Sequence, residues 1–398
     1  MEMSVRISRV NKLPGMEDLF DENFSVLQDL KLEISQTLYA GGYLEIDTPF
    51  FEDTELFLRK SGAALNSQLY SFVDPGGKKV SIRPEFTSSV IRNYIERNKG
   101  DSPQRIQYSG PVFRYDEVES KTIQLYQSGA ELIGSHGINS DVEISLLAWQ
   151  GLNKLGLVDC KLNFNNIGIL FGVLNNFGLS RLSQSMIMNN LGFLKEGDVD
   201  PDRLLANAQE IRIVSDKNDS SKNDFSEIDA EKMYTEMMRH TPYSSLGRRT
   251  KKQIIDRLIR KVRDMDSPEN FFSAVSLMKS MVQLEGHSLD VLNQSKDLLQ
   301  SKDIDIDSLV GFEGFFKKLI NSGIPEQNIF LSWGLLRGLS YYTGFTFDMV
   351  LLGSDSPVFC GGGGRYDDLV SALGGEKNIP ALGFAYDLNA ILPYIKTE

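Results

Sequence analysis

The sequence is poor in the residues that build disulfide frameworks and metal sites. Its 398 residues include only two cysteines and three histidines. Cys160 and Cys360 lie far apart and form no Cys-x-x-Cys pair, so we expect two buried, reduced thiols rather than a disulfide framework or a structural zinc site. The histidines, which lack the spacing of metal ligands, are His136, His240 and His287. We therefore expect no metal ion bound by histidine or cysteine.

Long apolar runs are also missing. The first residues, MEMSVRISRVNKLPG, contain no apolar segment of a secretory signal, and no later stretch approaches the ~18 to 20 uninterrupted apolar residues that a membrane span requires. With 41% hydrophobic residues, the chain can bury a large core, and its length favours more than one domain. The sequence therefore predicts a cytoplasmic protein that makes no membrane contact.

Positive charge is in deficit, since the formal net charge is −12. An acidic surface repels a nucleic-acid backbone, which disfavours a general nucleic-acid binder. Residues 248–264, RRTKKQIIDRLIRKVRD, are an exception, because basic residues there accompany apolar residues at helical spacing. This pattern predicts an amphipathic helix with a basic outer face. A solvated face or a contact with an acidic partner is the commoner role of such a helix, and an RNA-binding face is the alternative.

Periodicity predicts an α+β chain. Residues 16–43 have apolar residues at helical spacing that end at the stop signal Gly41-Gly42. A second helix is predicted at 140–156, with Ser140 or Asp141 as its cap. The predicted strands, which are rich in alternating apolar residues with Gly and Pro punctuation, are 43–49, 78–84, 105–116 and 123–134.

The middle of the chain has a different texture. From residue 186 to 319 helical periods dominate, broken by a polar and acidic stretch at 215–229 that we expect to be a mobile loop. Strand character returns at 328–352. The simplest organisation is one antiparallel α/β domain, residues 1–185 and 320–398, interrupted by a mainly helical insertion, residues 186–319.

Six segments occur in an order that is typical of one enzyme family. They are SIRPEFTSSVIR (81–92), GPVFRYD (110–116), QSGAELIG (127–134), LLRGLSYYTGFTFD (335–348), GGGRYDDLV (362–370) and PALGFAYDL (380–388). On these motifs the chain resembles the catalytic domain of class II histidyl-tRNA synthetases over nearly its whole length, and RGLSYYTG is the most specific of them. The resemblance implies an antiparallel sheet flanked by helices, with dimerisation through the N-terminal part.

The resemblance also implies a pocket for free histidine, whose carboxylate, ammonium and imidazole must all be satisfied. Arg337 can bind the carboxylate with its two-pronged guanidinium. The residues at the positions that hold the α-amino group are Glu85, Thr87 and Gln127. A carboxylate with two neutral acceptors suits an ammonium group.

The imidazole side of this implied pocket is aromatic. Glu131 with Tyr342 matches the pair that reads the imidazole, while Tyr341 and Tyr366 would close the apolar walls. The glycine run 361–364 is not a P-loop, because no Gly-Lys-Ser/Thr follows it. We expect it to let the backbone pass close to the bound amino acid.

The nucleotide half departs from the family pattern. Arg114, which we include among the pocket residues, matches the arginine that binds the α-phosphate. The arginine for the γ-phosphate closes a GLER-like ending, but here DLNA places Asn389 and Ala390 at the Glu and Arg positions. The loop after FRYD has Lys121 as its only cation. Each lost phosphate contact of this kind costs ~10² or more in rate, so adenylation should be very slow or absent.

The sequence given ends at AILPYIKTE, where a synthetase would continue into an anticodon-binding domain, so we expect no such domain and no tRNA ligand. This combination resembles the regulatory subunits of ATP phosphoribosyltransferase. It implies a non-catalytic homodimer, without a cofactor, in a hetero-oligomer with the short-form catalytic subunit of the first step of histidine biosynthesis, with L-histidine as feedback ligand. Ser340 is a departure, since the synthetases carry Asp there in RGLDYYTG.

Two other function classes remain open. The chain could be a minimal histidine-activating enzyme of the histidine-tRNA ligase type, which Arg114 favours and Ala390 opposes. It could also be a histidine-sensing adaptor with another client, such as a translation-linked kinase. A short phosphoribosyltransferase gene nearby in the genome would favour the regulatory subunit.

Overall fold

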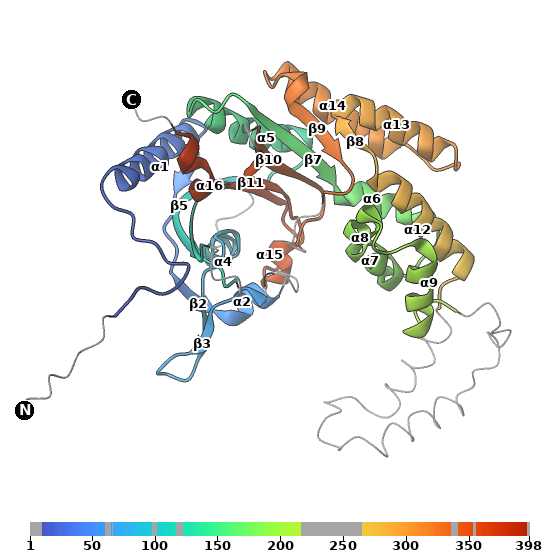
Figure 1. Cartoon of the computed structure of the whole chain (residues 1–398), viewed down its shortest axis with the longest axis horizontal. Helices are drawn as coiled ribbons and strands as arrows, with labels where there is room; N and C mark the ends of the chain where they lie inside the picture. The colour runs from blue at the N-terminus through green and yellow to red at the C-terminus, as the bar shows by residue number, and fades with distance from the viewer. Residues whose placement is uncertain are drawn as a thin grey trace, which may run out of the picture. The chain divides into compact units, whose positions relative to one another are not determined.

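The chain forms two compact units, which we describe from a computed structural model (Figure 1). The described residues are 10–59, 65, 67–97, 102–116, 122–215, 265–335, 341–352 and 356–395. The first unit consists of Met1–Gly168, Gly286–Asn293 and Leu309–Glu398. The second unit consists of Ile169–Glu285 and Gln294–Ser308. The sequence pattern placed the domain boundaries after residues 185 and 319 instead.

A large sheet forms the centre of the first unit. Its order within the described residues is β1-β5-β6-β12-β11-β10-β7-β9-β8. These strands are β1 (Leu44–Glu45), β5 (Gln104–Phe113), β6 (Gln124–Ile133), β7 (Cys160–Asn166), β8 (Glu285–His287), β9 (Ile329–Ser332), β10 (Phe345–Leu352), β11 (Pro357–Arg365) and β12 (Ala381–Asp387). The central pairs are antiparallel, whereas β1 with β5 and β7 with β9 are parallel. The sheet is therefore mixed, and not antiparallel throughout as the resemblance implied. Long crossover segments join the two strands of each parallel pair.

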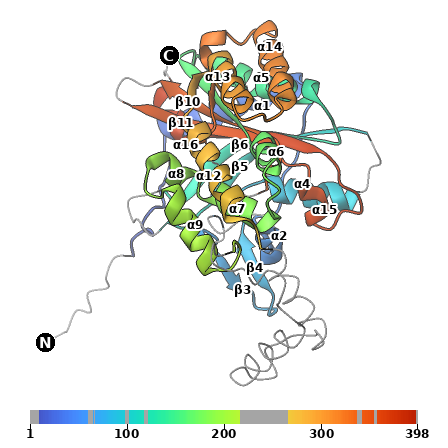
Figure 2. The same ribbon diagram turned by 90° about the vertical axis from the view of Figure 1, so that its right-hand side faces the viewer.

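Helices cover both faces of this sheet (Figure 2). On one face lie α1 (Glu22–Ala40) and α5 (Ile138–Lys154), which pack on each other and on β6. On the other lie α4 (Thr87–Arg97) and α15 (Leu369–Ala372), in one apolar cluster with Tyr108 of β5. The predicted helical stripe of α1 is confirmed at Leu27, Leu30, Ile34 and Leu38, which are buried, but not at Phe24, which is exposed.

Two local predictions were wrong. α5 begins at Ile138, two residues before Ser140. The residue before the helix is Gly137, whose φ of 82° suits a glycine, and no side chain caps this end of the helix. Ser140 lies in the first turn and its hydroxyl donates to the carbonyl of His136 at 3.1 Å rather than capping. The predicted strand 43–49 shrinks to Leu44–Glu45, because the carbonyl of Thr48 accepts from the buried Arg83 guanidinium at 2.6 Å instead of a strand neighbour.

The remaining elements of the first unit include a small antiparallel sheet with the order β2-β4-β3. Its strands are β2 (Phe51–Asp53), β3 (Ser71–Val73) and β4 (Lys79–Ile82). The other helical segments are α2 (Thr54–Leu58), α13 (Ser288–Gln300), α14 (Asp307–Asn321), η2 (Glu326–Asn328), α16 (Leu388–Ile391) and η3 (Leu392–Tyr394). The residues of α13 are divided between the two units.

The second unit is helical where it is described. Its helices are α6 (Ile167–Asn175), which starts at the end of the first unit, α7 (Arg181–Asn189), α8 (Leu191–Glu196), α9 (Pro201–Glu210) and α12 (Pro268–Val282). Both α9 and α12 begin with proline after a capping side chain, which is favourable because the first helical N–H has no partner. The predicted basic helix at 248–264 and almost all of the polar stretch 215–229 lie outside the described residues.

The cysteines are buried as predicted, Cys160 in β7 and Cys360 in β11. Burial raises the pKa of each thiol to about 12, so neither ionises at neutral pH. Among the helices that the structure describes, none has both the length and the apolar character to cross a membrane.

Candidate functional site

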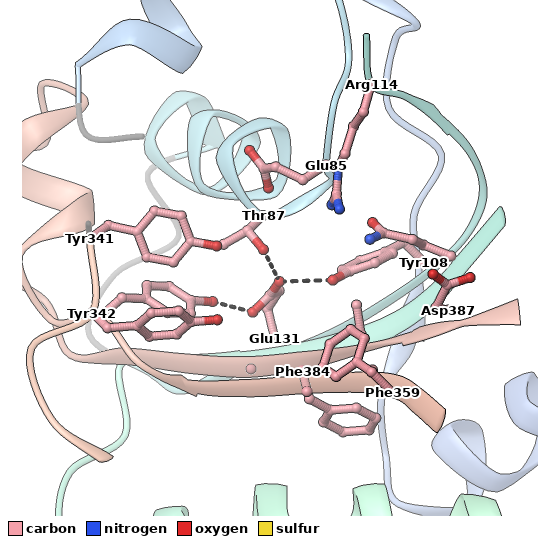
Figure 3. A pocket seen from close by; sticks show the side chains of 16 residues that line it. Glu85, Thr87, Tyr108, Arg114, Glu131, Tyr341, Tyr342, Phe359, Phe384 and Asp387 are labelled. Atoms are coloured by element: carbon pink, nitrogen blue, oxygen red, sulfur yellow. Dashed lines mark hydrogen bonds between the residues drawn. The ribbon is translucent and has the colours of Figure 1, made fainter. Parts of the chain in front are cut away.

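The structure describes eight of the nine residues predicted for the site, and all eight line one cavity of the first unit (Figure 3). They are Glu85, Thr87, Arg114, Gln127, Glu131, Tyr341, Tyr342 and Tyr366. Arg337 lies outside the described residues, as do Ser340 and Lys121. Segments that are far apart in the sequence thus meet over β6, β12 and β11.

Glycines make the floor of the cavity. Glu131 on β6 lies opposite Gly383 on β12, and a Cβ at Gly383 would overlap the Glu131 carboxylate. Gly129 is equally confined, since a Cβ there would lie 2.6 Å from the hydroxyl of Tyr108. Glycine is needed at both positions because the side chains of Glu131 and Tyr108 lie directly against the sheet backbone.

The carboxylate of Glu131 accepts hydrogen bonds from three side chains of the cavity (Figure 3). Its Oε1 accepts from the Thr87 hydroxyl at 2.6 Å and from the Tyr108 hydroxyl at 3.0 Å. Its Oε2 accepts from the Tyr366 hydroxyl. Burial raises the pKa of Glu131 to about 7, against the opposing effect of these hydroxyl donors. Glu131 is therefore a fixed acceptor whose charge changes near neutral pH.

The aromatic wall is tied to Glu131. The rings of Tyr341 and Tyr342 lie 4.9 Å apart between centroids, and that of Tyr366 lies 5.5 Å from Tyr341. Burial and the nearby Glu131 raise the pKa of Tyr366 well above its usual value, so it stays a neutral donor. Tyr366, to which the resemblance assigned an apolar wall, thus also donates a hydrogen bond to Glu131.

A partly buried cluster of one arginine and two carboxylates supports this wall. Arg365, next to Tyr366, donates from Nε to the Asp141 carboxylate at 2.9 Å and from Nη1 to that of Asp367 at 3.0 Å. The carbonyl of Arg365 accepts from the amide of Thr343 at 2.8 Å. The two segments that carry the tyrosines are therefore fixed to each other and to α5.

The opposite wall carries Glu85 and Arg114. The Glu85 carboxylate accepts from the amide of Ser88 at 3.1 and 3.2 Å, at the start of α4. Burial raises the pKa of Glu85, while Ser88 and Arg114 lower it. Arg114 in turn donates from Nε to the carbonyl of Pro84 at 2.9 Å. This wall therefore presents a buried carboxylate beside a guanidinium.

The end of β12 closes the cavity with residues that carry no positive charge. Asp387 lines the cavity, and its Oδ1 accepts from the amides of Asn389 and Ala390 at 3.1 and 3.2 Å. The Oδ1 of Asn389 accepts from the amide of Tyr126 at 2.6 Å, which fastens α16 to β6. The predicted loss of a cation at Ala390 is thus accompanied by a carboxylate at Asp387.

Sequence reasoning missed some lining residues, above all Tyr108 and Asp387. Tyr108 stands in the alternating segment 105–116, and its contact with Glu131 depends on the register between β5 and β6. Asp387 could have been found from the sequence, because DLNA has an aspartate where a GLER-like ending has glycine. Within the described ranges no group of three or more Asp, Glu, His or Cys side chains could hold a metal ion.

Comparison with known proteins agrees with this architecture. The model of the histidyl-tRNA synthetase family matches residues 15–211 and 243–391, which is most of the chain. The chain belongs to this family. The histidine--tRNA ligase of Methanococcus vannielii is 30% identical over 383 residues, which cover 96% of this chain and 75% of that protein.

Solved structures of family members share the fold. A Bacillus halodurans protein described as an ATP phosphoribosyltransferase regulatory subunit/histidyl-tRNA synthetase superposes with a TM-score of 0.69 at 20% identity, over 99% of this chain and 85% of that chain. A histidine--tRNA ligase subunit of Alicyclobacillus acidocaldarius gives a TM-score of 0.59 at 20% identity, over 97% of both chains. The predicted α+β fold, class II synthetase-like with a sheet flanked by helices, is confirmed.

Proposed function

We propose that the chain is a non-catalytic regulatory subunit of ATP phosphoribosyltransferase that binds histidine for feedback control. The observation that carries the proposal is the contrast between the two halves of the cavity. The half around Glu131 presents polar groups that suit an ammonium and an imidazole, namely Glu85, Thr87, Gln127 and Glu131, whereas the half at the end of β12 presents Asp387 and Ala390 instead of a cation.

Histidine fits the polar groups of the first half. Glu85 and Gln127 offer acceptors for the ligand ammonium on one side of the cavity. On the other side the imidazole N–H would donate to Glu131, displacing or sharing one of its hydroxyl donors. An amino acid without that N–H could not offer Glu131 a donor in exchange for the displaced hydroxyl, which gives a basis for discrimination between ligands of similar shape.

The half of the cavity at the end of β12 is unsuited to adenylation. Transfer of an adenylyl group needs fixed positive charge around the phosphates. Here Asn389 is used as an acceptor for the amide of Tyr126, and the methyl group of Ala390 offers no charge. We therefore propose that the chain binds a ligand, and that a partner subunit supplies the phosphoribosyltransferase activity.

The partner we propose is the short-form catalytic subunit, in a cytoplasmic hetero-oligomer that contains this chain as a homodimer. The Bacillus halodurans protein, which shares the fold, is described as an ATP phosphoribosyltransferase regulatory subunit/histidyl-tRNA synthetase, so the fold is compatible with this role. We expect no tRNA ligand.

A second function has its own support. The Methanococcus vannielii relative is a histidine--tRNA ligase, and Arg114, which matches the α-phosphate arginine, lines the cavity. A histidine-activating enzyme of that type is therefore the alternative.

Two assays separate these functions. Calorimetry of the purified chain should detect L-histidine binding and no saturable MgATP binding at millimolar nucleotide. Added to a short-form catalytic subunit from the same organism, the chain should confer histidine-sensitive phosphoribosyl transfer. Histidine-dependent exchange of pyrophosphate into ATP by the chain alone would overturn the proposal in favour of the ligase.

A further inference from the structure

Asp387 is one of the charged residues that line the cavity. It lies directly across from Gln127 in the register of β12 and β6, so two neighbouring strands present these side chains to the same space. Figure 3 shows the Asp387 carboxylate and the Arg114 guanidinium both directed toward the cavity.

The Asp387 carboxylate is held in place. Its Oδ1 accepts from two successive amides, those of Asn389 and Ala390. The helix that supplies these amides is itself fastened to β6 through Asn389 and the amide of Tyr126. The carboxylate therefore cannot leave the cavity wall without breaking these hydrogen bonds.

Arg114 interacts electrostatically with carboxylates on two elements. Burial raises the pKa of Glu85, before α4, and that of Asp387, at the end of β12, and the charge of Arg114 opposes the rise in both cases. The charged lining residues that the structure describes are Glu85, Glu131, Asp387 and Arg114. An anion that approaches Arg114 must therefore compete with carboxylates that are already part of the protein.

We propose that Asp387 is a specificity-determining residue that excludes phosphate-bearing ligands from the half of the cavity that Arg114 faces. This inference deepens the proposed function, on which it rests. It adds a cause of nucleotide exclusion that is separate from the missing cation at Ala390. The ligand class excluded is the polyphosphate anion, whether free pyrophosphate or the phosphates of a nucleotide.

The test is calorimetry with inorganic pyrophosphate and with MgATP. Asp387→Asn removes the charge but keeps a capping oxygen, and it should bind pyrophosphate at least about tenfold more tightly than the unchanged chain, the lower end of what one neighbouring charge does. Asp387→Ser, also a good N-cap residue, should show the same gain. The gain should disappear in the double variant Asp387→Asn/Arg114→Ala.

A matched control is Asp200→Asn. Asp200 caps α9 by accepting from the amide of Arg203 at 2.7 Å and does not line the cavity, so pyrophosphate binding should stay at the level of the unchanged chain.

Two results would overturn the inference. One is a folded, histidine-binding Asp387→Asn or Asp387→Ser protein that binds pyrophosphate no more tightly than the unchanged chain. The other is a gain that survives the loss of Arg114, because the anion would then bind elsewhere. If the unchanged chain fails to bind histidine while the gain appears, the proposed function fails and the role of Asp387 stands.

Discussion

The Glu131 carboxylate lies against the backbone of Gly383 on the neighbouring antiparallel strand, with no space for a Cβ between them. The Glu131 carboxylate is thus held by its hydroxyl donors on one side and by the backbone of Gly383 on the other. Neither contact can change without moving the carboxylate.

Gly383→Ala should therefore abolish histidine binding and destabilise the fold by about 1 to 3 kcal/mol, the usual cost of overpacking a filled site. Urea unfolding and calorimetry would measure both effects. Gly311→Ala is the control, because Gly311 lies in α14 with no atom near its Cβ position. A Gly383→Ala protein with normal histidine affinity would show that Glu131 does not contact the ligand.

Glu131→Gln should weaken histidine binding by about 1 to 3 kcal/mol, the range for a lost charged hydrogen bond. Glu143→Gln is a matched control, since Glu143 also accepts from a tyrosine hydroxyl, that of Tyr43 at 2.9 Å, but does not line the cavity. Inhibition of the reconstituted enzyme should weaken in parallel. Full inhibition together with lost binding would place the effector site on the catalytic subunit.

Tyr108→Phe should reduce histidine affinity by about 1 kcal/mol, the typical value of one hydrogen bond. The reason is that its hydroxyl stabilises the ionised form of Glu131, which is the form that accepts from the imidazole. Tyr43→Phe removes the same kind of hydrogen bond from Glu143 and should leave the affinity unchanged. Equal losses in the two variants would point to a general loss of stability.

The pH dependence of stability should report Glu131. Its pKa is raised from 4.5 to about 7 in the folded protein, so folding favours the protonated form. The resulting stabilisation is complete below pH 4.5 and is lost as the pH rises through the folded-state value. Relative to Glu131→Gln, the unliganded chain should lose up to about 3 kcal/mol across this window. Urea unfolding of both proteins at pH 5 to 8 measures the difference, and parallel curves would contradict it.

The dimer prediction concerns β2 and β3. Phe51 and Phe72 are 56% and 45% exposed, and their rings pack edge to face with centroids 5.8 Å apart. Phe51 belongs to the segment YLEIDTPFFED, and Phe72 packs against it. Phe51→Asp combined with Phe72→Asp should convert the dimer to a monomer in light scattering, because a charge would be buried at the interface. Phe193→Asp, at a residue that is 51% exposed in the second unit, should leave the dimer intact. A monomeric unchanged chain would contradict the prediction.

Regular periodicity made part of the fold predictable. The buried stripe of α1 and the alternation in the second half of β5 are encoded in local residue spacing, whereas β6 is buried continuously from Ser128 and does not alternate. β11 was not predictable in this way, because its glycine run lacks the side chains that identify a strand. The glycines are needed by tertiary structure, since a Cβ at Gly361 or Gly363 would overlap carbonyl oxygens of β12.

The candidate site was accessible through the order of its motifs, which placed Glu85, Gln127 and Glu131 together. Its internal contacts were not. The hydrogen bond between Tyr366 and Glu131 joins residues 235 positions apart and depends on how β6, β12 and the turn after β11 meet. Sequence spacing carries no information on which of several tyrosines reaches a given carboxylate.

The strand β12 also bears on how such a protein can diverge. Any side chain at Gly383 would collide with Glu131, so this position in the amino-acid half of the cavity does not tolerate substitution. At the other end of the same strand, short residues such as Asp387, Asn389 and Ala390 are accommodated within ordinary capping and strand-to-helix hydrogen bonds. Under the proposed function, point substitutions there would remove nucleotide chemistry while the fold and the amino-acid half stay intact, and few mutations would separate an enzyme from a sensor.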